Sequence, residues 1–214
     1  MKRYSFKIIF IGATGCGKTS IINVSNKEPF CNLFTSTIGV DFMSLNIERE
    51  GICYNLKIWD TGGHDRFNFL IKSYYRKISA IVITYDINNL HSFNIVENLI
   101  NEYYDNTGNT RTPILLLGNK TDLESTRVVT TEMGETLAER YNCIFLECSA
   151  KTYNNINFIY FMLIDKINKM IEEQNIKITD IENEYGIKYI KNNIQDLKIE
   201  DTGTILNNKC CTIL

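Results

Sequence analysis

The sequence predicts an α/β fold, in which a mostly parallel sheet of six strands has one antiparallel edge strand and helices on both faces. Short apolar segments alternate with segments of helical periodicity along the chain. Residues 81–83 and 114–117 are unbroken apolar runs, which are typical of parallel strands covered on both faces. A chain of 214 residues with 44% hydrophobic content is long enough for one such domain and a tail.

The individual elements follow from local patterns. A turn at Arg49, Glu50 and Gly51 separates two strand-like segments, which predicts an antiparallel hairpin. The last helix repeats its apolar residues at helical spacing, so one face belongs to the core. We expect strands at residues 6–11, 41–47, 52–60, 80–86, 114–119 and 144–148, and helices at 19–25, 92–104, 131–141 and 155–173.

The turn after the first strand carries a phosphate-binding motif. Residues 12–19 read GATGCGKT, and they join an apolar strand to the start of a helix. The glycines let successive N–H groups point at an anion, and the helix N-terminus adds unpaired donors. Lys18 supplies a charge for the β- and γ-phosphates, and Thr19 offers a hydroxyl to Mg²⁺. The alternative is a glycine-rich turn without a ligand.

Two further segments predict that the base is guanine. The first, from Asn119 to Asp122, follows an apolar strand, and the Asp122 carboxylate can accept hydrogen bonds from guanine N1–H and the exocyclic amine. The second, residues 147–151, closes the next strand, where a backbone N–H can reach guanine O6 and Lys151 can cover the base. A P-loop kinase or ATPase would account for neither segment, and competition between GTP and ATP would distinguish them.

Residues 59–63 end another strand and predict a metal-linked switch. Asp60 is placed to hold Mg²⁺ directly or through water, and the Gly63 N–H can reach the γ-phosphate. Thr37, in the loop before the hairpin, can add a second hydroxyl to the metal. Both loops would depend on the γ-phosphate, so its loss would release them together.

With these motifs, residues 6–173 resemble a small GTPase of the Ras superfamily, specifically of the Rab branch. The P-loop NTPase fold of small GTPases is therefore expected. The branch-specific features are residues 38–42, 56–61, 65–67 and 74–76 and the pair Cys210 and Cys211.

The resemblance implies that Phe30 packs on the guanine ring. It also implies an effector surface formed by Ile38, Phe42, Trp59 and Tyr74, although the aromatic residues could equally belong to an ordinary core.

The predicted site residues fall into three groups. Nucleotide contacts are expected from Thr14, Gly15, Cys16, Gly17, Lys18, Thr19, Ser20, Phe30, Thr37, Gly63, Asn119, Lys120, Asp122, Ser149, Ala150 and Lys151. The metal ligands are expected to be Thr19, Thr37 and Asp60. The catalytic group is expected to comprise Lys18, Thr37, Gly63 and His64.

His64 departs from the family pattern, in which a glutamine at this position orients the attacking water. Imidazole lacks the paired donor and acceptor of an amide, so we expect slow intrinsic hydrolysis. Activating proteins of the class that serves Rabs insert their own glutamine and arginine, which would leave stimulated hydrolysis intact. The alternatives are tolerated drift at His64 and a GTP-locked recruitment scaffold with negligible turnover.

The C-terminus predicts lipid attachment. Cys211 and the following Thr, Ile and Leu fit a prenylation motif that favours geranylgeranyl, and Cys210 supplies a second acceptor. Two lipids give durable anchoring, whereas two chance cysteines would give none. The predicted organisation is a GTPase domain at 1–174, a flexible linker at 175–209 and the prenylation motif at 210–214.

Composition bears on which partners the protein binds and in which compartment it is expected. The net charge of −2 gives no indication of nucleic-acid binding. Seven cysteines, an odd number, occur without a secretory signal, which favours reduced thiols. We expect a monomer on the cytoplasmic face of an intracellular membrane that cycles with the cytosol. Its expected partners are GTP or GDP with Mg²⁺, an exchange factor, a GTPase-activating protein, a GDP-dissociation inhibitor or escort, and effectors.

Overall fold

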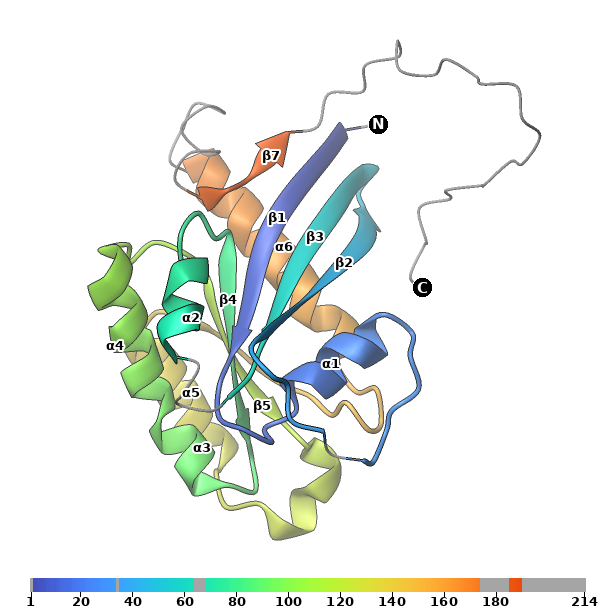
Figure 1. Ribbon diagram of the computed structural model, residues 1–214, viewed down its shortest axis with the longest axis vertical. Helices are drawn as coiled ribbons and strands as arrows, with labels where there is room; N and C mark the ends of the chain where they lie inside the picture. The colour runs from blue at the N-terminus through green and yellow to red at the C-terminus, as the bar shows by residue number, and fades with distance from the viewer. Residues whose placement is uncertain (1, 34, 64–67, 174–184, 190–214) are drawn as a thin grey trace, which may run out of the picture.

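One sheet forms the centre of the part of the chain that the structure describes, and helices cover both of its faces (Figure 1). The computed structural model describes residues 2–33, 35–63, 68–173 and 185–189. The strands are β1 (Lys2–Ile11), β2 (Val40–Arg49), β3 (Ile52–Thr61), β4 (Ala80–Asp86), β5 (Ile114–Asn119), β6 (Ile144–Glu147) and β7 (Lys188–Tyr189). The helices are α1 (Lys18–Ser25), α2 (Asn68–Tyr74), α3 (Leu90–Asn94), α4 (Val96–Thr107), α5 (Thr131–Arg140) and α6 (Ile156–Glu173), with a 3₁₀ helix at Thr121–Thr126.

The sheet has the predicted architecture. Its order is β2-β3-β1-β4-β5-β6, and β7 pairs with β1 outside this path. The β2–β3 pair is antiparallel, whereas β3–β1, β1–β4, β4–β5 and β5–β6 are parallel. Glu50 and Gly51 both have positive φ, 52° and 72°, as the tight turn of a two-residue hairpin requires. The predicted α/β fold with one antiparallel edge strand is therefore confirmed.

Two hydrophobic clusters hold the layers together. One lies between the sheet and helices α1 and α6, where Ile21, Ile159 and Leu163 are fully buried. The other lies on the opposite face, where Ile71, Ile100 and Leu137 from α2, α4 and α5 pack against the sheet. The helices cover the two faces of the sheet but not its ends. The carboxyl ends of the parallel strands therefore remain available for a ligand.

The helix expected at 92–104 is two helices in the structure. The Asn89 side chain accepts a hydrogen bond from the Ser92 N–H at 3.2 Å, so α3 starts at Leu90. The Ser92 hydroxyl in turn donates to the Asn89 carbonyl at 2.6 Å, and α3 ends at Asn94, with Ile95 between it and α4. These bonds between short polar side chains and nearby backbone fix the start of α3 two residues before the predicted one.

Strand β7 was not predicted from the sequence, and it lies within the range assigned to the linker. It pairs with β1 in antiparallel fashion at Tyr4 and Ser5. Just before it, Tyr185 and Ile187 are buried in the cluster of α1 and α6. The Ser79 hydroxyl accepts from the Lys7 N–H at 2.9 Å and donates to the Tyr185 carbonyl at 3.0 Å. Residues 185–189 are thus part of the folded domain.

A glycine makes this docking possible. Gly186 has φ +62°, and a Cβ placed on it would lie 2.1 Å from the Lys77 carbonyl oxygen. We expect Gly186→Ala to detach β7 and to lower the free energy of unfolding by about 1–3 kcal/mol. Amide hydrogen exchange in β1 next to β7 should accelerate. Gly51 has φ +72° with nothing near its Cβ position, so Gly51→Ala is a matched control for backbone strain. Equal effects of the two variants would show that the contact with Lys77 is unimportant.

Candidate nucleotide-binding site

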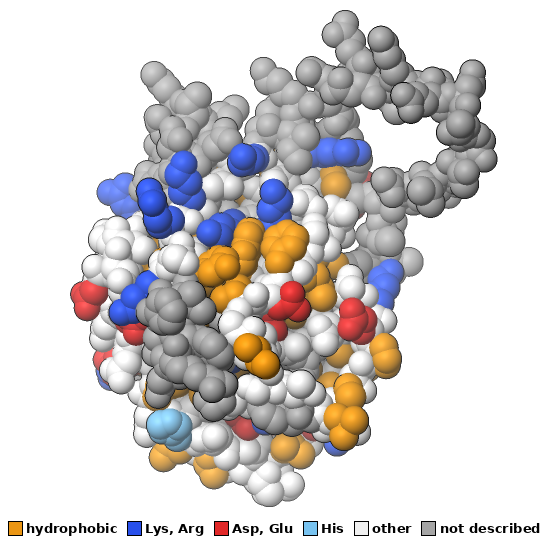
Figure 2. Space-filling view, in the orientation of Figure 1, with side chains coloured by type: hydrophobic (Ala, Val, Ile, Leu, Met, Phe, Trp, Pro, Cys, Tyr) orange, Lys and Arg blue, Asp and Glu red, His pale blue; other side chains and the backbone are white. Residues whose placement is uncertain are grey.

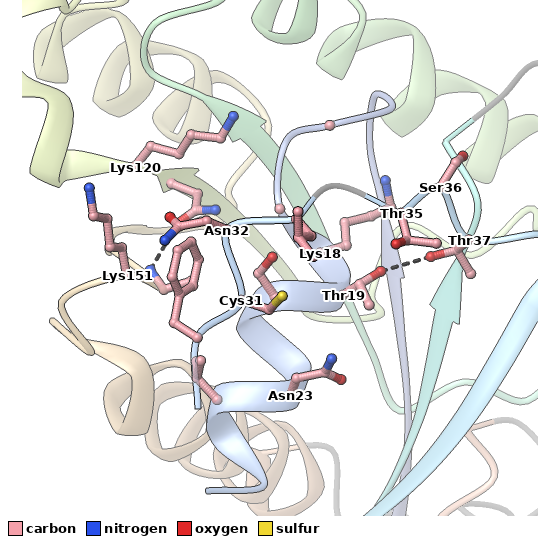
Figure 3. A pocket seen from close by; sticks show the side chains of 18 of the residues that line it. Lys18, Thr19, Asn23, Cys31, Asn32, Thr35, Ser36, Thr37, Lys120 and Lys151 are labelled. Carbon is pink, nitrogen blue, oxygen red and sulfur yellow. Dashed lines mark hydrogen bonds between the residues drawn. The ribbon is translucent and has the colours of Figure 1, made fainter. Parts of the chain in front are cut away.

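A cavity of about 460 Å³ lies at the carboxyl ends of the parallel strands (Figure 3). Its wall brings together the loop after β1, the start of α1, the loop before β2, and the loops after β3, β5 and β6. The predicted residues that line it are Thr14, Gly15, Gly17, Lys18, Thr19, Ser20, Phe30, Thr37, Gly63, Asn119, Lys120, Asp122, Ala150 and Lys151. Cys16 and Ser149 are fully buried and do not line the cavity.

The phosphate-binding loop is tightly packed. Gly17 has φ +96°, and a Cβ on it would lie 2.2 Å from the Asn119 side-chain nitrogen, so only glycine fits. Lys18 is 5% exposed, and its ammonium donates to the carbonyl groups of Gly12 and Ala13 at 2.8 and 2.9 Å. These bonds hold the positive charge against the loop beside the cavity, where a phosphate ligand would need it.

Three oxygen-bearing side chains converge at the Mg²⁺ position predicted from the sequence. The Thr19 hydroxyl donates to Asp60 Oδ2 at 2.5 Å and lies 2.8 Å from the Thr37 hydroxyl (Figure 3). Burial raises the pKa of the Asp60 carboxyl, and the hydrogen bond from Thr19 opposes that rise. Asp60 Oδ1 is buried and has no hydrogen-bond partner among the described residues. Hydroxyl and carboxylate oxygens suit a hard divalent cation, so this donor set fits Mg²⁺.

The opposite end of the cavity presents a carboxylate. Ser149 donates its hydroxyl proton to Asp122 Oδ1 at 2.5 Å, and the Lys151 ammonium lies 3.9 Å from Asp122 Oδ2. Phe30 lines the cavity on the side of the loop before β2, and its backbone N–H donates to the Tyr153 hydroxyl at 3.1 Å. A planar base can therefore lie between the Phe30 and Lys151 side chains, with the Asp122 carboxylate at its edge.

Asn119 has a structural role that its sequence motif does not reveal. It is 2% exposed, and its side-chain nitrogen donates to the Cys16 carbonyl at 2.8 Å. Its side-chain oxygen accepts from the Ala150 N–H at 3.2 Å. One amide thus connects the phosphate-binding loop with the segment after β6. Reading the chain alone missed this link because the partner groups are backbone atoms far away in sequence.

Two other site residues were also missed from the sequence. Asp86, at the end of β4, forms an ion pair with the Lys120 ammonium at 2.7 Å. Tyr153 holds the backbone of Phe30, as described above. The sequence does carry a signal for Asp86, because a charged residue ends the apolar segment of β4 at the ligand-binding edge of the sheet.

The loop after β3 lies directly against the phosphate-binding loop. A Cβ on Gly63 would be 2.4 Å from the Thr14 backbone nitrogen and 2.5 Å from the Ala13 carbonyl carbon. Glycine is therefore required for this close approach of two backbones. His64, the next residue, lies outside the described residues.

The predicted effector residues form a partly exposed surface. Ile38 is 83% exposed and Phe42 is 53% exposed, and the Phe42 and Trp59 rings meet edge to face at 5.0 Å. Trp59 and Tyr74 are half-buried against the cluster of α2, α4 and α5. The Lys7 ammonium lies 5.0 Å from the centre of the Trp59 ring and donates to the Tyr74 carbonyl at 2.9 Å. Phe42 thus lies outside the core, whereas Trp59 and Tyr74 lie at its edge.

The lipid-attachment cysteines, Cys210 and Cys211, lie outside the described residues. Within the described ranges, no helix combines the length and apolar character needed to cross a membrane.

Comparison with known proteins identifies the family. The family model described as Ras family matches residues 7–169. The chain is 37% identical over 171 residues to the Ras-related protein RABD2b of Arabidopsis thaliana, covering 80% of this chain and 84% of the relative. It is 36% identical over 188 residues to the Ras-related protein Rab-8B of Homo sapiens, covering 83% and 90%. The chain belongs to the Ras superfamily of small GTPases, and within it to the Rab branch.

Proposed function

We propose that this GTPase is a membrane-bound switch in vesicle and protein transport, which recruits effectors in its GTP form and hydrolyses GTP slowly unless a partner assists it. The observation that carries this proposal is the convergence of Thr19, Thr37 and Asp60, which come from α1, the loop before β2 and β3. The loop before β2 and the end of β3 thereby share one polar centre with the phosphate-binding helix.

This centre supports a switch because the loop and the strand that meet there also lead to the effector surface. Thr37 directly precedes Ile38, and Gly63 is the second residue after the strand that carries Trp59. Mg²⁺ bound here would neutralise phosphate charge. Thr37 and the Gly63 backbone N–H would respond to the γ-phosphate, and their release after hydrolysis would alter the surface around Ile38, Phe42, Trp59 and Tyr74.

For membrane attachment we propose geranylgeranyl groups on Cys210 and Cys211. The final Leu214 favours this lipid, and two chains anchor a protein far longer than one. Regulated cycling then requires an exchange factor, an activating protein and an escort that shields the lipids. The proposed location is the cytoplasmic face of an intracellular membrane.

His64 determines how fast the switch turns off by itself. An imidazole cannot orient water and γ-phosphate as a glutamine amide does, so the proposal includes slow intrinsic hydrolysis. The same residue favours a second candidate, a GTP-locked scaffold whose function is recruitment without useful turnover.

We expect His64→Gln to raise the single-turnover rate of GTP hydrolysis at least ~10-fold, because the amide restores an oriented water. The measurement uses purified protein loaded with Mg²⁺ and GTP, with and without a broad-specificity Rab-activating domain. Wild-type turnover that the domain accelerates would support the switch.

The variant also serves as the control for the activating domain. If the domain accelerates His64→Gln but leaves the wild type near zero, the scaffold is the better description. If the intrinsic rates of the two proteins are equal, His64 does not limit hydrolysis and the proposal of a slow intrinsic step is wrong.

A further inference from the structure

A groove of about 720 Å³ lies at the end of the sheet opposite the nucleotide cavity. One wall is the connection from α2 to β4, residues 75–78, and the other is the C-terminal end of α4 with the loop that follows. These segments precede the amino ends of β4 and β5, whereas the nucleotide cavity lies at the carboxyl ends. The groove is therefore separate from the site already described.

Three cationic side chains line this groove. Arg76, Lys77 and Arg111 are all exposed, and none of them forms an ion pair with a described residue. No Asp or Glu is among the described residues that line it. Like charges gathered without counter-charges repel one another, and a bound polyanion would relieve this repulsion.

The backbone that carries these cations is held in place. The Lys7 ammonium donates to the Arg76 carbonyl at 3.0 Å, and the Asn109 side-chain oxygen accepts from the Arg111 N–H at 2.9 Å. Below them, the buried rings of Tyr75 and Tyr103 meet edge to face at 5.3 Å. A groove with a firm floor and fixed backbone can present its charges in one arrangement, which a diffuse surface charge cannot do.

The groove lies beside the segment that leads to the C-terminus. Gly186 packs against the Lys77 carbonyl, and Ser79 bonds to the Tyr185 carbonyl. Figure 2 shows that Lys and Arg side chains gather over this end of the visible face, while Asp and Glu side chains lie mainly nearer the middle and the opposite end.

Docking of β7 shortens the tether to the predicted lipid sites. Cys210 is 21 residues after Tyr189, so a fully extended chain from the end of β7 would span about 70 Å at most. If the chain were free from the end of α6 at Glu173, the span would be about 125 Å. A shorter tether raises the effective concentration of this end of the domain at a membrane.

We propose that the groove of Arg76, Lys77 and Arg111 binds the phosphorylated headgroup of an anionic membrane lipid. A soluble polyphosphate presents the same phosphate groups as a lipid headgroup. We choose the lipid because the proposed prenylation would hold the domain at a membrane. Arginine forks bind phosphate oxygens in pairs, and a phosphorylated inositol ring presents several such groups. Binding orients the domain so that the nucleotide cavity, at the opposite end of the sheet, faces away from the lipid.

The test uses the full chain without prenylation, loaded with GDP and Mg²⁺, and measures partitioning onto vesicles. One vesicle contains phosphatidylcholine with phosphatidylinositol bisphosphate, and the other contains phosphatidylserine at equal total charge. We expect at least ~10-fold tighter binding to the first vesicle. Arg76→Glu combined with Arg111→Glu should remove this difference, since the variant lacks both guanidinium forks that would bind the headgroup phosphates.

Lys27→Glu is the control for charge. Lys27 is exposed just after α1, a helix on the opposite face of the sheet from α2 and α4, and forms no ion pair with a described residue. Lys27→Glu and Arg111→Glu change the net charge equally. Retained GDP binding would establish that each variant is folded. Equal losses for the two single variants would overturn the proposal, as would equal wild-type binding to both vesicles. Soluble inositol trisphosphate that binds as tightly as the vesicles would overturn the lipid assignment.

Because this experiment needs no prenyl group, it is independent of the proposed lipid attachment. The intact mass of protein from a eukaryotic host tests that attachment separately. Unmodified cysteines would refute the anchor without affecting the vesicle result.

Discussion

Asp122→Asn is expected to lower the affinity for GTP on the order of 1,000-fold and to make xanthosine triphosphate the better ligand. A carboxylate accepts hydrogen bonds from both guanine N1–H and the exocyclic amine. An asparagine would offer one acceptor and turn a donor toward that amine, leaving buried polar groups unpaired. Xanthine carries a carbonyl where guanine has the amine, so the amide and this base match.

Competition binding with GTP, xanthosine triphosphate and ATP measures this change. Ser149→Ala is a suitable control, because it removes the hydroxyl that bonds Asp122 Oδ1 and leaves the carboxylate in place. It should weaken GTP about 10-fold at most without changing the preferred base. An Asp122→Asn variant that still prefers GTP would mean that another group reads the base.

Thr19→Ala should accelerate GDP release at least ~10-fold in the presence of Mg²⁺. The Thr19 hydroxyl contacts both Asp60 and Thr37, so its removal takes one oxygen from the predicted cation site and leaves Asp60 with a buried, poorly paired carboxylate. A fluorescent GDP analogue would report the release rate.

Chelation distinguishes a cation site from a purely structural role. Adding EDTA should accelerate release from the wild type and change the already fast variant little. Ser20→Ala, one residue further along α1, should keep the full response to EDTA because the three-oxygen cluster is intact. If EDTA accelerates release from Thr19→Ala as strongly as from the wild type, Thr19 does not hold the metal.

The sheet and the phosphate-binding loop could be predicted because their signals are local. An unbroken apolar run such as that of β4, followed by a polar turn, identifies a buried parallel strand without knowledge of its neighbours. The GATGCGKT motif likewise specifies a loop whose glycines the structure requires, as the contact of Gly17 with Asn119 demonstrates. Such features depend on a few adjacent residues.

Other features depend on partners far along the chain and could not be predicted. β7 consists of two residues, and it exists because β1 extends to Lys2 and leaves backbone groups available beyond the start of β4. The ion pair between Asp86 and Lys120 joins the ends of two strands. Neither the length nor the composition of these segments indicates which distant group they will meet.

The bridge made by Asn119 has a consequence for nucleotide exchange. The Asn119 side chain is bonded to both the Cys16 carbonyl and the Ala150 N–H. The phosphate-binding loop and the loop beside the base therefore cannot move apart without breaking one of these two hydrogen bonds. A regulator that displaces only one of these loops therefore loosens the grip at both ends of the nucleotide. We expect such a regulator to need contact with only one of the two loops.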